Sequence, residues 1–298
     1  MVYVDSLSNV SVADVNFNNN LLDAENTINA GLLRTGQSSN VELNNLNILD
    51  NNISASIYIQ GMVYVDALSN VSVADINFNN NLLDAEGSIN GGLLRTGQSS
   101  KVELNNLNIL DNNISASRHI QGMVYVDALS NVSVADVNFN NNLLDAESTI
   151  YGGLLRTGQS SNVELSNLNI LDNNISASNN IQGVVYVDSL SNVSVADVNF
   201  NNNLLDAKNM IRGGFIIVIN GTCTLSNITF KNNNVLNYYQ FYSFIRTQAN
   251  STIVLTDVHF YRNYMSGEEN FGSILSAVKS AATVNYCYIE DNCNPQSP

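Results

Sequence analysis

A period of 61 residues runs through this chain and constrains its fold more than any other feature. Met1, Met62, Met123 and Val184 occupy the same slot of nearly identical copies, and each copy splits into two related halves. The register continues through the divergent C-terminal third, where the copies no longer match letter for letter. The first apolar residue of each half marks ten units at intervals of 29 to 31 residues: Val10, Val41, Val71, Val102, Val132, Val163, Val193, Cys223, Ile253 and Ala282. Such a fixed period is typical of solenoids, whose units pack on their neighbours.

Within each unit, apolar and polar residues alternate as they do in a strand with one buried face. The first unit shows this at Val10, Val12, Val15 and Phe17, with an extra residue at Ala13-Asp14 that suggests a bend. Two or three short strands in thirty residues cannot bury an apolar face unless the units stack. We therefore predict an all-β parallel β-helix of about ten coils of 30–31 residues, about 4.8 Å apart. Amphipathic helices would need a period of 3.6, and a leucine-rich repeat would be shorter.

The solenoid is expected to contain two parts. Residues 1–207 hold the near-identical double-coil repeats, and residues 208–298 hold divergent coils that are a candidate cap. Because Met1 fills the same slot as Met62 and Met123, we expect it to be an internal residue of a longer array. Any targeting segment would then lie upstream of this chain.

One asparagine slot is occupied in all ten units, three residues after the Phe17 position. An asparagine side chain tolerates a tight turn and can bond to identical amides above and below it. We predict a structural asparagine ladder here, whereas neighbours such as Asn18 and Asn19 are interpreted as turn-filling residues. The ladder would contain Asn20, Asn51, Asn81, Asn112, Asn142, Asn173, Asn203, Asn233, Asn263 and Asn292.

A second row alternates tyrosine and arginine and is expected to face outward. Stacked at strand spacing, these residues would form cation–π contacts. In one interpretation, these side chains form an exterior stack and contact only one another. In the other, they form a flat amphipathic stripe, flanked by residues such as Met62 and Leu93, that packs against another rod or on sugar rings. The candidate interaction stripe contains Tyr3, Arg34, Tyr64, Arg95, Tyr125, Arg156 and Tyr186.

Two short signatures resemble those of a known family. F-x-x-N occurs at Phe17 to Asn20, Phe230 to Asn233 and Phe260 to Asn263, and a Gly-Gly-apolar-apolar run begins at Gly91, Gly152 and Gly213. Both are similar to the repeats of chlamydial polymorphic membrane proteins and related protist cell-surface proteins. The resemblance implies a right-handed β-helix and a cell-surface passenger, adhesive or structural, and it carries over no catalytic residue. Several coils depart from the pattern, for instance at Gln121-Gly122.

Ten Asn-x-Ser/Thr sequons are candidate glycosylation sites at strand edges and turns, if the chain is secreted through a eukaryotic pathway. In a chain rich in Asn and Ser, however, copying one repeat also multiplies chance sequons. The sequons lie at Asn9, Asn52, Asn70, Asn113, Asn131, Asn174, Asn192, Asn220, Asn227 and Asn250.

Composition excludes several classes of function. A net charge of −15 argues against nucleic-acid and anionic-membrane surfaces, and the longest apolar run, Phe215 to Ile219, is too short to span a bilayer. With two histidines and three cysteines, we expect no transition-metal site and no cofactor. Cys287 and Cys293 flank a turn and are candidates for a disulfide; a free, buried Cys287 is the alternative.

No unique acid/base constellation is visible, so we expect no catalytic residue. The sequence favours a non-enzymatic, glycosylated extracellular rod that self-associates into a filament or surface layer. A cell-surface adhesin that binds carbohydrate or a partner surface is the alternative, and a polysaccharide lyase or hydrolase is a weaker one. The number of repeats in the full protein and the adhesion target stay open.

Overall fold

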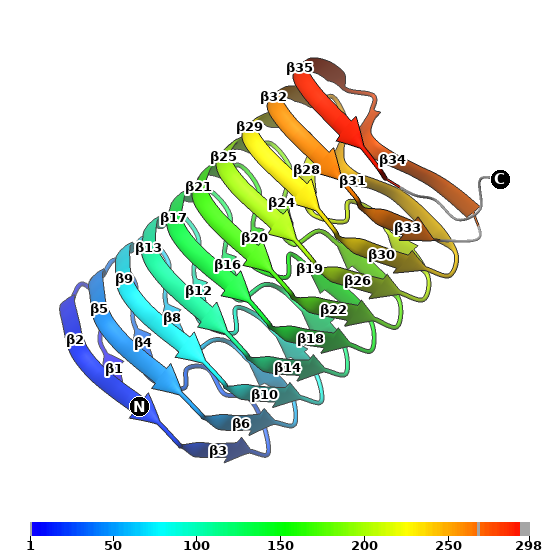
Figure 1. Ribbon diagram of the computed structural model, residues 1–298. Helices are drawn as coiled ribbons and strands as arrows, with labels where there is room; N and C mark the ends of the chain where they lie inside the picture. The colour runs from blue at the N-terminus through cyan, green and yellow to red at the C-terminus, as the bar shows by residue number, and fades with distance from the viewer. Residues whose placement is uncertain (1, 267–268, 293–298) are drawn as a thin grey trace.

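The chain forms a parallel β-helix of about nine turns, where about ten were expected. The computed structural model describes residues 2–266 and 269–292, and these contain strands but no helix. Successive coils lie side by side along a rod, with the first strand, β1, and the last strand, β35, toward opposite ends (Figure 1). All strand pairs are parallel, as the stacked-coil prediction requires.

The longest strands build a ten-stranded sheet along one side of the rod (Figure 1). Each of them has ten residues, and a left-handed residue such as Asp14, with φ of 56°, bends it in the middle without ending it. The extra residue at Ala13-Asp14 is therefore a bend within one strand. The sheet contains β2 (Asn9–Asn18), β5 (Asn40–Leu49), β9 (Asn70–Asn79), β13 (Lys101–Leu110), β17 (Asn131–Asn140), β21 (Asn162–Leu171), β25 (Asn192–Asn201), β29 (Thr222–Lys231), β32 (Thr252–Tyr261) and β35 (Ala281–Glu290).

A nine-stranded sheet follows the asparagine slot in each turn. Its strands are short, with three or four residues each, and their small buried residues, such as Ala85, fit the sharp turn of the coil. The sheet contains β3 (Leu21–Ala24), β6 (Asn52–Ala55), β10 (Leu82–Ala85), β14 (Asn113–Ala116), β18 (Leu143–Ala146), β22 (Asn174–Ala177), β26 (Leu204–Ala207), β30 (Asn234–Asn237) and β33 (Tyr264–Ser266).

The third sheet consists of two sets of very short strands that meet on β31. Most coils thus have four strands rather than the two or three expected, because glycines with positive φ, such as Gly61 and Gly91, break this side of the coil into two segments. In the last two coils the two segments fuse into β31 (Gln240–Gln248) and β34 (Glu269–Val278). The first set is β1 (Val2–Val4), β4 (Leu33–Thr35), β8 (Val63–Val65), β12 (Leu94–Thr96), β16 (Val124–Val126), β20 (Leu155–Thr157), β24 (Val185–Val187) and β28 (Ile216–Ile219); the second set is β7 (Tyr58–Ile59), β11 (Ser88–Ile89), β15 (His119–Ile120), β19 (Thr149–Tyr151), β23 (Asn180–Gln182) and β27 (Met210–Ile211).

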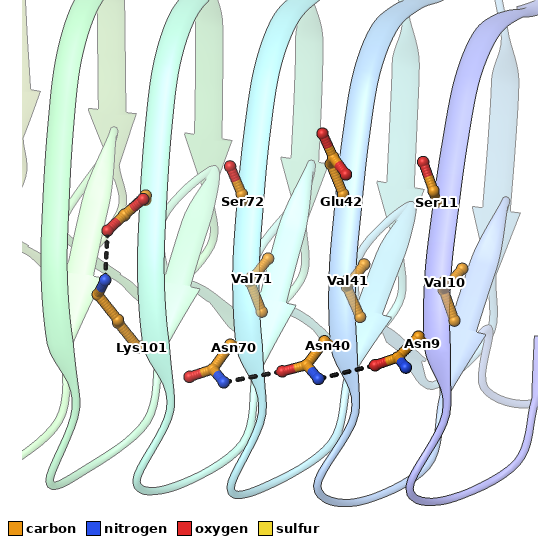
Figure 2. Close-up of a pocket in the computed structure, with 11 residues that line it drawn as sticks. Asn9, Val10, Ser11, Asn40, Val41, Glu42, Asn70, Val71, Ser72 and Lys101 are labelled. Carbon is orange, nitrogen blue, oxygen red and sulfur yellow. Dashed lines mark hydrogen bonds and ion pairs between the residues drawn. The ribbon is translucent and has the colours of Figure 1, made fainter.

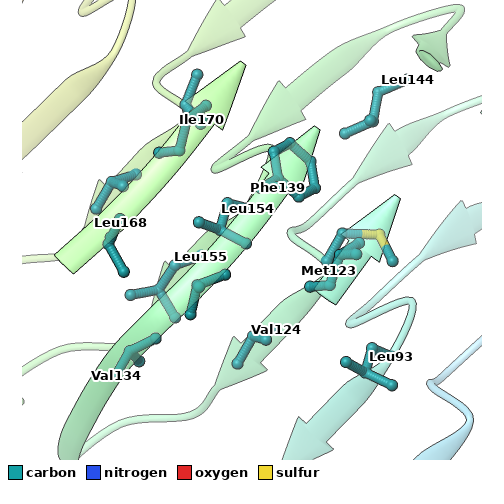
Figure 3. Packing of buried hydrophobic residues seen from close by; sticks show 14 of the residues in the cluster. Leu93, Met123, Val124, Val134, Phe139, Leu144, Leu154, Leu155, Leu168 and Ile170 are labelled. Atoms are coloured by element: carbon teal, nitrogen blue, oxygen red, sulfur yellow. The ribbon is translucent and has the colours of Figure 1, made fainter. Parts of the chain in front are cut away.

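The apolar rows stack in register and fill the interior. Phe17 pairs with Ile48, and Ile48 pairs with Phe78, as the repeat predicts. Figure 3 shows residues such as Phe139, Met123 and Leu154 interdigitating between the strands. In the divergent coils the phenylalanines become consecutive, and the rings of Phe200, Phe230 and Phe260 stack with centroids 4.9 and 4.7 Å apart. One continuous core therefore runs through the whole solenoid.

The predicted asparagine ladder is present and buried along almost its whole length. The backbone N–H and Nδ2 of Asn112 both donate to Oδ1 of Asn142, at 3.1 and 2.9 Å. Asn142 in turn donates from Nδ2 to the carbonyl oxygen of Ile109, at 2.9 Å, in the same coil as Asn112. Each amide thus satisfies backbone groups at the turn and connects three successive coils, from Asn20 to Asn292.

Removing one ladder amide should destabilise the protein much more than removing an exposed asparagine. In Asn142→Ala, both donors of Asn112 and the carbonyl of Ile109 lose a partner, and each buried orphan costs about 1–3 kcal/mol. We expect a loss of about 3 kcal/mol or more, measured from urea unfolding.

Asn138→Ala is the matched control, because Asn138 is only half-buried and makes one donor and one acceptor bond to its neighbours. We expect it to cost less than about 1 kcal/mol, since its partners can turn to water. Equal losses in the two variants would contradict a structural role for the buried ladder.

Candidate interaction surfaces

A polar groove runs along the outer face of the ten-stranded sheet. Its first section is about 540 Å³ and is lined by β2, β5, β9 and the start of β13 (Figure 2). A further hollow of about 420 Å³ continues it past Lys101 toward Glu164. The outward positions of these strands alternate serine and glutamate, as in Ser11, Glu42 and Ser72. The groove therefore repeats the same chemistry every second coil.

A second asparagine ladder, which the sequence analysis missed, forms one wall of this groove. Nδ2 of Asn40 donates to Oδ1 of Asn9, and Nδ2 of Asn70 donates to Oδ1 of Asn40, both at 2.8 Å (Figure 2). Lys101 takes the slot in the next coil and pairs with Glu103, with Nζ and Oε1 2.6 Å apart. The ladder resumes between Asn131, Asn162 and Asn192.

A third ladder lies on the same face beyond the groove. Nδ2 of Asn47 donates to Oδ1 of Asn16 at 2.9 Å, and the pattern continues through Asn169. Asn18 is also more than a turn-filling residue, because its Oδ1 accepts the N–H of Leu49. In the sequence, these rows show the same pattern as the buried ladder, because an asparagine recurs every 30 or 31 residues. Listing the recurrent asparagines of every position in the repeat would therefore have predicted them.

Exposed aspartates on this sheet and on the nine-stranded sheet pair with polar neighbours in the adjacent coil. Nδ2 of Asn45 donates to Oδ1 of Asp14, and the hydroxyl of Ser54 donates to Oδ1 of Asp23 at 2.6 Å. No cluster of three or more His, Cys, Asp or Glu side chains suited to a metal ion occurs among residues 2–266 and 269–292. Within the same ranges, no helix could cross a membrane.

The tyrosine–arginine row forms a half-buried seam rather than a flat stripe. Strand register places Tyr3, Arg34, Tyr64, Arg95, Tyr125, Arg156 and Tyr186 directly over one another. The flanking residues Met62 and Leu93, expected beside the stripe, are in the core instead. The reason is the glycine corner: the seam lies where the two strand sets of the third sheet meet at an inward angle.

The angle brings outward side chains of both strand sets together. Nη1 of Arg95 donates to Oε1 of Gln60 at 2.7 Å, and Arg156 makes the equivalent bond to Gln121. The guanidinium carbon of Arg95 lies 5.6 and 5.4 Å from the ring centroids of Tyr64 and Tyr125. Arg156 lies among three rings, of which Tyr151 is nearest at 4.8 Å. Cation–π contacts thus cover the faces of these guanidinium groups.

Two tyrosines of the seam, Tyr125 and Tyr186, are largely shielded from water. Burial, followed by the nearby carboxylate of Asp127, raises the pKa of Tyr125. Burial and Asp188 raise the pKa of Tyr186 to about 12. Both hydroxyls therefore stay protonated well above neutral pH and can act as hydrogen-bond donors.

All ten sequon asparagines lie at the surface. Nine are exposed, and Asn220 is half-buried. Those at Asn9, Asn70, Asn131 and Asn192 belong to the groove ladder, whereas Asn52, Asn113 and Asn174 begin strands of the nine-stranded sheet. The repeat therefore places one sequon per coil, alternating between two faces of the rod.

The cysteines carry little reactivity. Cys223 is fully buried, and burial raises the pKa of its thiol to about 12. Cys287 is half-buried, and burial raises the pKa of its thiol as well. The proposed Cys287–Cys293 pairing falls partly outside the described residues, because Cys293 is not among them.

Comparisons with known proteins give little support for an identity. No protein-family model matches this sequence, and no curated protein matches it either. Among solved structures, the chain has a weak likeness to PfbA, a surface adhesin of Streptococcus pneumoniae. The match covers 88% of this chain and 85% of that one, at 9% identity and a TM-score of 0.15.

The buried seam predicts a specific alkaline transition. Because the folded protein favours the neutral phenol of Tyr186, the stabilisation it gives is complete below the ordinary pKa of 10.0 and is lost as pH rises through about 12. Titration followed by phenolate absorbance should show a late-ionising tyrosine that disappears in Tyr186→Phe. The exposed Tyr3 is the control, and Tyr3→Phe should leave the late-ionising tyrosine in place. Loss of an early group in Tyr186→Phe would contradict the buried position.

Proposed function

We propose that this protein is a non-enzymatic, extracellular structural rod, a subunit of a filament or surface coat. The observation that carries the proposal is the repetition of one outer surface along the solenoid. The groove, the outer asparagine ladders and the seam repeat their residues every second coil, so they form extended surfaces rather than a single site. Ten strands at a spacing of about 4.8 Å give a rod about 43 Å long.

Secretion and glycosylation are part of the proposal. Sequon asparagines are solvent-exposed or half-buried and lie outside the core, so a glycan would not disturb packing. Glycans on two faces would shield the exposed aspartate and asparagine rows from proteases. Solubility would then rest on the glycans together with the net charge of −15.

Self-association end to end would extend the stacking of the solenoid itself. Each coil pairs in parallel and in register with the next, so the terminal coil of one rod could continue the same stacking on another rod. A strand edge left open at the end of the full rod would be a template for such pairing.

Adhesion is the second candidate function. The seam favours it, because its arginine and tyrosine side chains differ from the acidic and amide-rich outer faces of the other two sheets. Polysaccharide cleavage has less support. Glu42 and Glu103 in the groove are exposed and occupy one repeated slot, so they form no unique acid/base pair.

Microscopy of the purified protein tests the structural role. We expect long, uniform fibres in negative stain, with sedimentation that depends on concentration. Arg95→Glu should leave end-to-end fibres intact but weaken any side-by-side packing through the seam, because it reverses the charge there. Dispersed short rods at all concentrations would contradict the filament proposal, and chain scission in a panel of polysaccharides would contradict the non-enzymatic one.

Glycosylation is tested with two asparagines of the groove ladder. Asn70 lies in a sequon, whereas Asn40, its hydrogen-bonded neighbour, does not. After secretion from eukaryotic cells, Asn70→Gln should remove the mass of one glycan, and Asn40→Gln should leave the mass of attached glycans unchanged. An intact mass that shows no glycan on the wild-type protein would rule the proposal out.

A further inference from the structure

Arginine recurs along the seam of this acidic chain. Three of the seven arginines, Arg34, Arg95 and Arg156, lie in the seam, and Arg246 lies in the same row beyond Ile217. Only three ion pairs form within residues 2–266 and 269–292, and none of them involves a seam arginine. The seam is therefore a line of cationic groups whose charge the surrounding protein leaves without a direct partner.

The guanidinium groups of the seam are held with their faces covered. Tyrosine rings lie above and below Arg95 and beside Arg156, which leaves the edges of these groups for hydrogen bonding. A guanidinium carries five N–H donors, and the Arg95 side chain makes one hydrogen bond, to Gln60. An edge fixed in this way suits the two oxygens of a carboxylate or sulfate group.

At the C-terminal end of the row the charge is almost enclosed. Arg246 is 9% exposed, and its Nε and Nη1 have no hydrogen-bond partner. The ring of Tyr242 lies 4.1 Å from its guanidinium carbon, and burial, with a smaller contribution from the like charge of Arg212, lowers the pKa of Arg246. A buried charge without a counter-ion is costly, so a bound anion would be strongly favoured at this end.

The spacing of the seam points to a regular polymer. Arg34, Arg95 and Arg156 recur every second strand, at about 9.6 Å. A straight row of identical sites fits a ligand whose acidic groups also recur at a fixed interval, as they do in a polysaccharide with one acidic sugar per disaccharide. An extended acidic peptide places the side chains of one face about 6.8 Å apart, which does not match this interval. Protonated tyrosine hydroxyls between the arginines can donate hydrogen bonds to sugar oxygens.

We propose that the seam binds a linear acidic polysaccharide along the rod axis, with its carboxylate or sulfate groups on the guanidinium edges of Arg34, Arg95 and Arg156. Carboxylates also lie beside the seam, because Asp127 and Asp188 are close enough to raise the pKa of the buried Tyr125 and Tyr186, so the acidic groups of the polymer must reach the guanidinium edges between them. This inference rests on the adhesive candidate function. The proposed structural role is tested independently, by microscopy of the protein without a ligand.

Binding is measured by calorimetry with the full chain and three probes. Chondroitin sulfate oligosaccharides supply acidic groups at the disaccharide interval, sodium sulfate supplies the free anion, and poly-glutamate supplies an acidic peptide. We expect saturable binding of the oligosaccharide, at least about tenfold tighter than that of poly-glutamate, equivalent to about 1.4 kcal/mol. Sulfate alone should bind weakly and compete at high concentration.

The paired variant Arg95→Gln/Arg156→Gln should weaken oligosaccharide binding by at least about tenfold. Lys101→Gln removes a positive charge outside the seam and should leave the affinity unchanged. Arg95→Lys/Arg156→Lys keeps the positive charge but removes the planar set of guanidinium N–H donors. Its affinity should lie between those of the wild-type protein and the paired glutamine variant, which separates hydrogen bonding by the guanidinium groups from general electrostatic attraction. Circular dichroism melting confirms that each variant is folded.

Three results would overturn the proposal. They are no binding of the oligosaccharide to the wild-type protein, equal loss in the Lys101 variant, and equal or tighter binding of poly-glutamate. The last result would assign the seam to an acidic protein partner instead.

Discussion

In-register stacking of parallel coils is the constraint on which this structure depends. Because each strand pairs with the equivalent strand of the next coil, every side chain lies beside the residue in its own slot. Apolar slots then form continuous core rows, and amide slots form ladders. The same rule places like charges together, so a charged slot needs a neutral or opposite neighbour. The sequence meets that need by alternation: Asp14 lies beside Asn45, and Arg95 lies between two tyrosines.

The buried asparagine ladder holds the turn where two sheets meet. It replaces the water that would otherwise satisfy the backbone at the turn after each long strand, and it does so with bonds in both directions along the axis. The outer ladders run with the opposite polarity, since Asn77 donates to Asn47 whereas Asn51 donates to Asn81. They remain in contact with solvent and therefore add less to stability. The three rows thus contribute differently to the free energy of unfolding, although all of them consist of asparagines.

The parts of the fold that follow from slot periodicity could be predicted, and the parts that depend on backbone conformation could not. The pairing of Phe17 with Ile48 and the ladder at Asn51 need only the repeat length and a strand pattern. The inward angle of the seam depends instead on glycines such as Gly61, whose positive φ leaves no signature in hydrophobic alternation. A tyrosine–arginine row that was expected on a flat surface therefore lies in a half-buried seam. The fusion of two segments into β31 was missed for the same reason, because no glycine corner interrupts that strand.

Distances between spin labels test the stacking of coils most directly. Ser11, Ser72 and Ser194 occupy one exposed slot, with Ser72 two strands and Ser194 six strands from Ser11. In a variant without its three native cysteines, labels on Ser11→Cys/Ser72→Cys should lie about 10 Å apart, and labels on Ser11→Cys/Ser194→Cys about 29 Å apart. Distances that grow in proportion to the number of coils would support the account. A broad distribution, or a Ser11–Ser194 distance that departs from six strand spacings, would contradict it.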